Sequence, residues 1–337
     1  MAYKNIAVRA AFVNVICLAQ LLHAQSGIAP IDIERVGQSG WQFLKIDGDA
    51  RQAALAGAYT AISFGDANAI FGNPAALSDV TNFNVQLNAI QWIADIGHQS
   101  IAVAANAGDI GVFGASIVKL NYGEMAETIN LPIDAGGTTP YVTGNTFSAN
   151  DIAAGVSYAR KITDKLSVGG NMRWMREQIA ELSMTNWSVD FGTMYYIGLK
   201  SLRVAIVARN FGPDSKFGGW SEQYQTESVN IRLPLDFRVG LAMDFMDEEQ
   251  SPHLLTVTME GDHPNDGKEK FNLGASYSFE KTIFLRCGYK FNYDVQRFTF
   301  GAGLNYSSGR TIGTVNYAYV DFGELTHVHM ISLGFAF

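Results

Sequence analysis

Two histidines near the end of the chain have a spacing that would suit a metal ion. His327 and His329 are two residues apart in an alternating segment, and side chains two apart on a strand point to the same side. A zinc site needs at least three protein ligands, and no third candidate is evident beside them. We therefore expect interfacial or loop histidines here, and we predict no metal site.

Side chains with oxygen ligands cluster in the segment Asp-His-Pro-Asn-Asp-Gly at 262–267. A calcium loop of the EF-hand type needs a fixed ligand spacing that ends in a glutamate. Neither the spacing nor the glutamate is present. The segment therefore predicts a turn on the outer side of the protein.

Other motifs that could carry chemistry are weak. Gly301 and Gly303 form a G-x-G, but no helix follows that could cradle a phosphate. No Ser-His-Asp arrangement and no spaced pair of carboxylates stands out, so we predict that the chain is not an enzyme and holds no cofactor. The net charge of −8 argues against nucleic acid as a partner.

Most of these residues lie in segments in which apolar side chains alternate with small or polar ones. The last nine residues are the clearest case, with Ile331, Leu333, Phe335 and Phe337 on one face. A period of two is the pattern of a β-strand, and an apolar outer face suits the wall of an outer-membrane barrel. We predict that Phe335 and Phe337 also form the signal for barrel insertion. Fourteen such segments are predicted: 83–92, 97–106, 110–120, 147–161, 165–176, 183–197, 201–210, 229–246, 253–261, 269–279, 282–292, 297–307, 311–320 and 326–337.

Charged residues within these segments fall on the polar face. Arg238, Asp244, Arg286 and Lys290 all do so. An arginine that faces lipid at mid-depth costs about 2–4 kcal/mol, so this face must line a lumen. The sequence therefore predicts an all-β fold, a 14-stranded antiparallel transmembrane β-barrel over residues 83–337. We expect a monomeric barrel in contact with outer-membrane lipid.

The predicted connections differ in length between the two ends of the barrel. Most of those at one end are short, whereas the other end has long connections at 121–146, 211–228 and 262–268. Short periplasmic turns and long outer loops are typical of outer-membrane barrels. Two of the outer loops carry apolar and aromatic residues of the kind that anchor interfaces. We predict that partners bind there, at Leu131, Tyr141, Phe217, Trp220 and Tyr224.

Residues 1–24 have the pattern of a secretory signal peptide. Two basic residues precede an apolar run from Ala10 to Leu22, and Ala24 offers a cleavage position. The run is too short to span a membrane, and a buried N-terminal helix is the alternative. We predict cleavage after Ala24 and a location in the outer membrane of a Gram-negative bacterium.

Residues 25–82 differ from the strands that follow. The stretch 49–61 is rich in alanine, the best helix former, and Ala53, Gly57 and Ala61 would form a bare strip on one helix face. Asn73-Pro74 is a turn and helix-start signal. We predict short helices that enter the lumen as a plug, or hatch, because a 14-stranded barrel is wide enough to need a filling. A small periplasmic subdomain is the alternative.

The same segment carries a resemblance to a known family. The N-terminal signature of the PorV/PorQ family is similar, in order, to the strings Gly40–Ile46, Ala50-Arg51, Ala56–Tyr59, Asp66–Ala69 and Asn73–Ala75. That family consists of outer-membrane barrels of Bacteroidetes and related bacteria, similar in fold to FadL-type transporters. The sequence departs from the signature at Asp47-Gly48-Asp49 and at Leu55. The resemblance implies a hatch motif that comprises Arg51, Gly57, Asp66, Asn68, Asn73 and Pro74.

The resemblance also implies a function. PorV-like members act in type IX secretion, where they bind the C-terminal signal domains of exported proteins and pass them to an attachment complex. This implies a non-enzymatic carrier or scaffold, with cargo signal domains and secretion or attachment subunits as partners. The alternative is a passive transporter of small hydrophobic molecules, with the hatch around Asn73-Pro74 controlling a lumen pocket. For a transporter we expect an apolar pocket lined by the hatch and an opening in the barrel wall.

Overall fold

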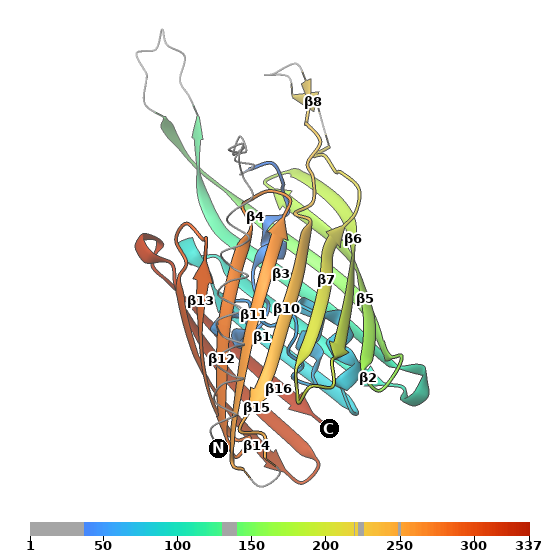
Figure 1. The fold of residues 1–337 in the computed structure, drawn as a ribbon. Helices are drawn as coiled ribbons and strands as arrows, with labels where there is room; N and C mark the ends of the chain where they lie inside the picture. Colours follow the sequence, from blue (N-terminus) through green and yellow to red (C-terminus); the bar gives the residue numbers. More distant parts are fainter. Residues whose placement is uncertain (1–36, 130–139, 219, 222–225, 249–250) are drawn as a thin grey trace, which may run out of the picture. The chain divides into compact units, whose positions relative to one another are not determined.

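Fourteen antiparallel strands form a closed barrel (Figure 1). A computed structural model describes residues 37–129, 140–218, 220–221, 226–248 and 251–337. The predicted signal peptide, Leu131 and Tyr224 lie outside these residues. The wall strands are β1 (Phe83–Gln91), β2 (Gly97–Asn106), β3 (Val112–Ile129), β4 (Tyr141–Lys161), β5 (Leu166–Ile179), β6 (Leu182–Tyr196), β7 (Arg203–Phe211), β10 (Asp236–Phe245), β11 (His253–Pro264), β12 (Lys270–Phe279), β13 (Ile283–Phe291), β14 (Phe298–Ser308), β15 (Thr311–Asp321) and β16 (His327–Ala336).

The last strand closes the barrel on the first. Leu333 of β16 pairs with Leu87 of β1, and the Phe337 amide donates to the Phe83 carbonyl oxygen at 3.0 Å. Antiparallel pairing continues around the ring through β2 to β15. Because a closed ring has no free edge, its backbone groups find their partners within the wall, as a hydrocarbon environment requires. The predicted fourteen-stranded barrel is confirmed.

The outer face of the wall is apolar and its inner face is polar, as the alternation of side chains predicts. On β14, Phe300 is 51% exposed and Leu304 is 56% exposed on the outside, whereas the Thr299 side chain on the inside is fully buried. Arg238 and Arg286 are also buried on the lumen side. The outside is therefore the lipid-facing surface, and the charges lie within the lumen.

The carboxyl-terminal aromatic residue is predicted to matter for assembly. The Phe337 ring packs 6.2 Å from the Phe83 ring, at the seam between the first and last strands. We expect Phe337→Ala to lower the amount of assembled barrel in the outer membrane several-fold, measured by heat-modifiable migration of membrane fractions. Ile331→Ala is the matched control, because Ile331 is a lipid-facing side chain of the same strand. Equal amounts of assembled barrel for both variants would refute the insertion signal.

The two ends of the barrel have different connections. Phe83 and Phe337 meet at the end that carries the short turns 162–165, 280–282 and 309–310. We call this the inner end, since short turns face the periplasm in outer-membrane barrels. The opposite, outer end carries the long connection 212–235, which contains the two-stranded sheet of β8 (Trp220–Ser221) and β9 (Thr226–Glu227).

The predicted loop 121–146 is wrong over most of its length. β3 and β4 continue their pairing beyond the other strands as far as Ile129 and Tyr141, and Figure 1 shows this hairpin rising above the outer end. The register shifts between Asn121 and Glu124, and a shift of this kind disturbs the simple alternation that sequence analysis relies on.

Residues 37–82 form the hatch, which lies inside the ring of strands (Figure 1). Its helices are the 3₁₀-helix η1 (Gln42–Lys45), the α-helix α2 (Ala50–Ala54), and the 3₁₀-helices η2 (Ala67–Phe71) and η3 (Pro74–Asp79). Three further 3₁₀ turns lie in connections: η4 (Ile93–Asp95), η5 (Gly108–Ile110) and η7 (Gly323–Leu325). Helix α2 contacts β13 to β16, and η3 contacts β3 to β6. None of the helices in the described residues is long and apolar enough to cross a membrane.

The bare strip predicted for Ala53, Gly57 and Ala61 is wrong, because α2 ends at Ala54. Ala56 and Gly57 have positive φ angles of 59° and 81°, which a right-handed helix cannot contain. Close approach to the wall comes instead from barrel glycines. A Cβ atom on Gly301 would lie 2.5 Å from Ala54 Cβ, so any larger residue at that position would push α2 away from the wall.

Candidate functional site

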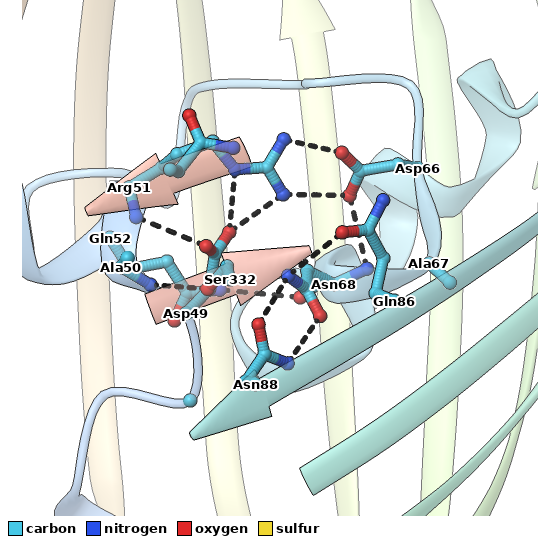
Figure 2. Close-up of polar contacts among 12 residues, drawn as sticks. Asp49, Ala50, Arg51, Gln52, Asp66, Ala67, Asn68, Gln86, Asn88 and Ser332 are labelled. Atoms are coloured by element: carbon cyan, nitrogen blue, oxygen red, sulfur yellow. Dashed lines mark hydrogen bonds and ion pairs between the residues drawn. The ribbon is translucent and has the colours of Figure 1, made fainter. Parts of the chain in front are cut away.

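The hatch is held together by a buried ion cluster, which we call the latch and which comprises Asp49, Arg51 and Asp66 (Figure 2). The Arg51 Nε atom donates to Asp49 Oδ2 at 2.8 Å, and its Nη2 atom donates to Asp66 Oδ1 at 3.1 Å. The guanidinium also lies over the Phe64 ring, 4.3 Å from its centre. The latch therefore joins α2 to the segment that leads into η2.

Opposite charges keep Asp49 and Arg51 ionised despite their burial. Burial would raise the pKa of Asp49, but the charge and hydrogen bonds of Arg51 bring it below its usual value of 3.8. Burial would likewise lower the pKa of Arg51, but the two carboxylates raise it. A depressed carboxyl pKa stabilises the folded state above the usual pKa, and this contribution is lost as the pH falls through the folded-state pKa. The Asp49–Arg51 pair therefore stays charged at neutral pH.

Amide side chains fasten the latch to the barrel wall (Figure 2). The backbone N–H of Asn68 donates to Asp66 Oδ1 at 3.1 Å, and the side chains of Asn68 and Asn88 exchange hydrogen bonds of 3.1 and 2.9 Å. The Ala50 amide donates to Ser332 Oγ at 2.9 Å. Asn88 belongs to β1 and Ser332 to β16. The latch is thus attached to the two strands that close the barrel.

Asn73 and Pro74 fasten a different part of the hatch. The Asn73 Nδ2 atom donates to the carbonyl oxygens of Thr60 at 2.8 Å and Thr193 at 3.2 Å. Pro74 begins η3, and a Cβ atom on Gly169 of β5 would lie 2.5 Å from the Pro74 carbonyl carbon. These contacts hold η3 against β5 and β6, away from the latch. Five of the predicted hatch residues therefore form two groups, and the sixth, Gly57, lies at a cavity in the lumen.

Two cavities adjoin the hatch inside the lumen. The outer cavity has a volume of about 420 Å³ and includes Asp47 and Gly57 of the hatch in its wall. The inner cavity has a volume of about 440 Å³ and includes Arg51, Phe64 and Asp66. Sites for small molecules typically have volumes of about 300–1,000 Å³. Both cavities are therefore large enough for a small ligand.

The outer cavity has one apolar and one charged side. Trp92 and Phe322 form the apolar side, with their rings 5.0 Å apart and edge to face. On the charged side, the amino groups of Lys270 and Lys290 lie 4.5 and 5.0 Å from the centre of the Tyr293 ring. The outer cavity therefore offers both apolar and charged surface to a ligand.

A second ion cluster joins the wall beside the outer cavity to the hatch. Arg238 donates to Asp236 Oδ2 at 2.5 Å and to Glu260 Oε1 at 3.4 Å. The other carboxylate oxygen of Glu260 accepts a hydrogen bond from the Thr60 amide at 2.8 Å. The hatch backbone is therefore held by charges of β10 and β11 as well as by its own latch.

The segment 262–267 serves as a tether for the beginning of the hatch. Asp266 lies in the connection after β11, at the outer end. Its carboxylate accepts hydrogen bonds from Lys45 at 2.6 Å, from Gln42 at 3.1 Å and from Ser39. Burial alone would raise the pKa of Asp266, but these hydrogen bonds bring it below its usual value. Asp266 therefore forms an ion pair with Lys45 of the hatch.

The two histidines of the last strand lie outside the lumen. The Nδ1 atoms of His329 and His327 are each 2.7 Å from a hydroxyl group, that of Tyr317 and that of Tyr319 respectively. All four residues are on the outer half of β15 and β16. In the part of the chain that the structure describes, no group of three or more His, Cys, Asp or Glu is placed to hold a metal ion.

Of the predicted partner-binding residues, Tyr141, Phe217 and Trp220 lie in the described part of the chain. Tyr141 begins β4 and is exposed at the raised hairpin. Phe217 is half-buried and packs against the buried cluster around Trp41 of the hatch. Trp220 lies in the short strand β8.

Sequence analysis missed three residues of the site. Asp49 departs from the PorV/PorQ signature, yet it caps α2 and pairs with Arg51. Its position directly before an alanine-rich stretch is a cap signal that could have identified it. Asn88 and Ser332 are ordinary lumen-facing strand residues, and nothing in their spacing indicates contact with the hatch.

Comparison with known proteins supports the fold. No protein family model and no curated protein matches the sequence. Solved structures do match: the Ralstonia pickettii toluene transporter TbuX has a TM-score of 0.54 at 13% identity, covering 86% of this chain and 97% of that chain. The chain is similar in fold to FadL-like outer-membrane barrels. The Pseudomonas putida toluene transporter TodX has a TM-score of 0.55 at 11% identity, and the match covers 86% of this chain and 96% of that chain. A Pseudomonas aeruginosa FadL homologue has a TM-score of 0.50 at 11% identity, and the match covers 86% of this chain and 98% of that chain.

These similarities bear on the location as well. An outer-membrane barrel fold supports a place in the outer membrane, with the lipid-facing surface described above. The similarity is one of fold alone at these identities. Membership of the PorV/PorQ family, the signal peptide and an origin in Bacteroidetes stay predictions.

Proposed function

We propose that this protein lets small hydrophobic molecules pass the outer membrane passively, through a lumen that the hatch controls. The observation that carries the proposal is the pair of cavities at the hatch, one toward each end of a FadL-like barrel. The neighbours in fold include two described as toluene transporters and one described as a monoaromatic hydrocarbon channel. The alternative drawn from sequence is thus better supported than the carrier role.

The route that we propose runs through the lumen past the hatch. Asp47 and Gly57 of the hatch line the outer cavity, and Phe64 and Asp66 line the inner one. A molecule that moves from one cavity to the other must therefore displace hatch residues. Each wall strand pairs with both of its neighbours, and the pairing is irregular between β3 and β4 and between β6 and β7.

Uptake by whole cells tests the proposal. Small hydrophobic molecules cross phospholipid readily, so the barrier to measure is the intact outer membrane of a bacterial host. We expect host cells that express the assembled barrel to take up labelled toluene several-fold faster than cells with an empty vector. Uptake at the empty-vector rate, with the barrel verified in the membrane by heat-modifiable migration, would overturn the proposal.

A carrier role in type IX secretion is the second candidate. The observation that favours it is the raised hairpin of β3 and β4, where Ile129, Tyr141 and Val142 are exposed. Exposed apolar side chains that gather at one place mark interaction sites. We expect a carrier to retain the C-terminal signal domains of secreted proteins in a pulldown from native membranes. A pulldown that recovers none of these domains would count against the role.

A further inference from the structure

Two basic side chains on the outside of the barrel are an exception to its apolar outer face. Lys119 of β3 and Arg176 of β5 flank Ile152 of β4, because each of them pairs with that residue. Directly paired residues share one face of a sheet, and both basic side chains are exposed beside the buried Leu120 and Met175. Neighbouring strands lie about 4.8 Å apart, so the backbones of the two basic residues are about 10 Å apart. Their long side chains can therefore reach one ligand over Ile152.

The two cations keep most of their donors available. The Arg176 Nη2 atom donates to Ser183 Oγ at 3.4 Å, which leaves most of the five N–H donors of a guanidinium free. The Lys119 ammonium has no ion pair or hydrogen bond with the described residues. Toward the outer end, the next charged residue on this face of β3 to β5 is Glu124, whose pairing row lies four residues of β4 beyond that of Lys119. The two rows are therefore about 13 Å apart along the strands, and the positive charge stays available to a ligand.

An apolar strip lies directly below the two cations, on the side of the membrane centre. Ala154 of β4 pairs with Ile117 on one side and with Trp174 on the other. Ile117 is 53% exposed and Trp174 is 48% exposed, and Trp174 pairs in turn with the exposed Trp187 of β6. Tryptophan rings are enriched where hydrocarbon meets the headgroups. The apolar strip therefore lies at the edge of the hydrocarbon, and the methyl group of Ala154 leaves room for an acyl chain between two larger side chains.

The two cations lie just beyond this strip, at the level of the lipid headgroups. Lys119 follows Ile117 by two residues and Arg176 follows Trp174 by two residues, on the same face of each strand. Other strands present phenylalanine to the lipid near their outer ends, namely Phe237, Phe271, Phe291 and Phe298. The pair of cations is therefore a local feature of one side of the barrel, where an anionic headgroup would neutralise it.

We propose that the lipid-facing side of β3, β4 and β5 binds an anionic lipid of the outer leaflet. The lipid phosphate lies between Lys119 and Arg176, and an acyl chain lies against Ile117, Ala154 and Trp174. Lysine and arginine both bind phosphate through charge-assisted hydrogen bonds, and basic clusters at the membrane surface attract anionic lipids. The site lies outside the barrel, so its occupancy does not depend on the proposed transport through the lumen.

Quenching of tryptophan fluorescence by brominated lipids tests the site in the full barrel, reconstituted in phosphatidylcholine vesicles. Bromine on an acyl chain quenches the rings that it contacts, and Trp174 and Trp187 face the lipid. At equal fractions of brominated lipid, we expect a several-fold higher relative association constant for phosphatidylglycerol, which is anionic, than for phosphatidylcholine, which has no net charge. Equal constants for the two lipids would overturn the proposal. A preference that persists when both residues are replaced by phenylalanine would place the lipid elsewhere and would also overturn it.

Substitutions of the two cations identify the headgroup site. We expect Lys119→Gln with Arg176→Gln to abolish the preference for phosphatidylglycerol, and high salt to weaken it in the native barrel because salt screens exposed charges. Arg160→Gln is the matched control, because Arg160 is an exposed arginine near the inner end of β4, and its preference should equal that of the native barrel. Heat-modifiable migration verifies that each variant is folded. A native-like preference in the folded double variant would refute the assignment.

Discussion

Replacing Arg51 with alanine is expected to release the hatch and open the lumen to ions. The change leaves the carboxylates of Asp49 and Asp66 buried without their shared cation. Breaking a buried ion pair by removing one partner costs about 3–5 kcal/mol. Since about 1.4 kcal/mol corresponds to a factor of ten in an equilibrium constant, the population of opened hatch should rise by two orders of magnitude or more.

The measurement is the conductance of the purified barrel in planar lipid bilayers. We expect a closed or rarely open native barrel and frequent or lasting openings in Arg51→Ala. Lys161→Ala is the matched control, because Lys161 also pairs with a hatch carboxylate, that of Asp79, but is 56% exposed. An exposed ion pair contributes about 1 kcal/mol or less, so this control should conduct like the native barrel. Native-like conductance of Arg51→Ala would contradict the role of the latch.

A disulfide between the hatch and the wall is expected to reverse the effect of Arg51→Ala. An ideal Cβ atom on Gly240 of β10 lies 3.3 Å from Ala61 Cβ, close to the Cβ separation of about 3.8 Å in disulfides. The same Cβ atom would lie 3.0 Å from the Ala61 backbone nitrogen, so Ala61→Cys with Gly240→Cys should cross-link after the hatch and β10 move apart by about 0.5 Å. The native Cys287 is exposed and is replaced by serine in this variant.

The cross-link is tested in the Arg51→Ala background. We expect low conductance while the disulfide is intact and high conductance after a reducing agent is added. The single substitution Gly240→Cys is the control for the bulk of the new side chain, and reduction should leave its conductance unchanged. If the cross-linked barrel conducts as freely as the reduced one, ions do not pass where the hatch meets β10.

The barrel was predictable because each of its strands carries its own signal. Lipid on one side and a lumen on the other impose a period of two, and a charge such as Arg238 shows which face is inside. The outer hairpin was missed because its register shifts between Asn121 and Glu124, where the period is interrupted. Local pattern thus predicts the wall but not how far a strand continues beyond the membrane.

The hatch was less predictable because its interactions are distant in sequence. Arg51 and Asp66 belong to the implied motif, but their pairing across 15 residues depends on the turn that follows α2. Asp49 deviates from the family signature, and its roles as helix cap and ion partner of Arg51 become visible only in the structure.

The central claim is that hydrophobic molecules pass through a lumen gated by the hatch. The most direct test is the uptake of labelled toluene by host cells that express the Ala61→Cys, Gly240→Cys, Cys287→Ser barrel, measured before and after a membrane-permeant reducing agent. We predict uptake near the empty-vector rate while the disulfide is intact, and a several-fold faster rate once it is reduced. Uptake that is fast and equal in both states, with the cross-link verified by mass spectrometry, would contradict the claim.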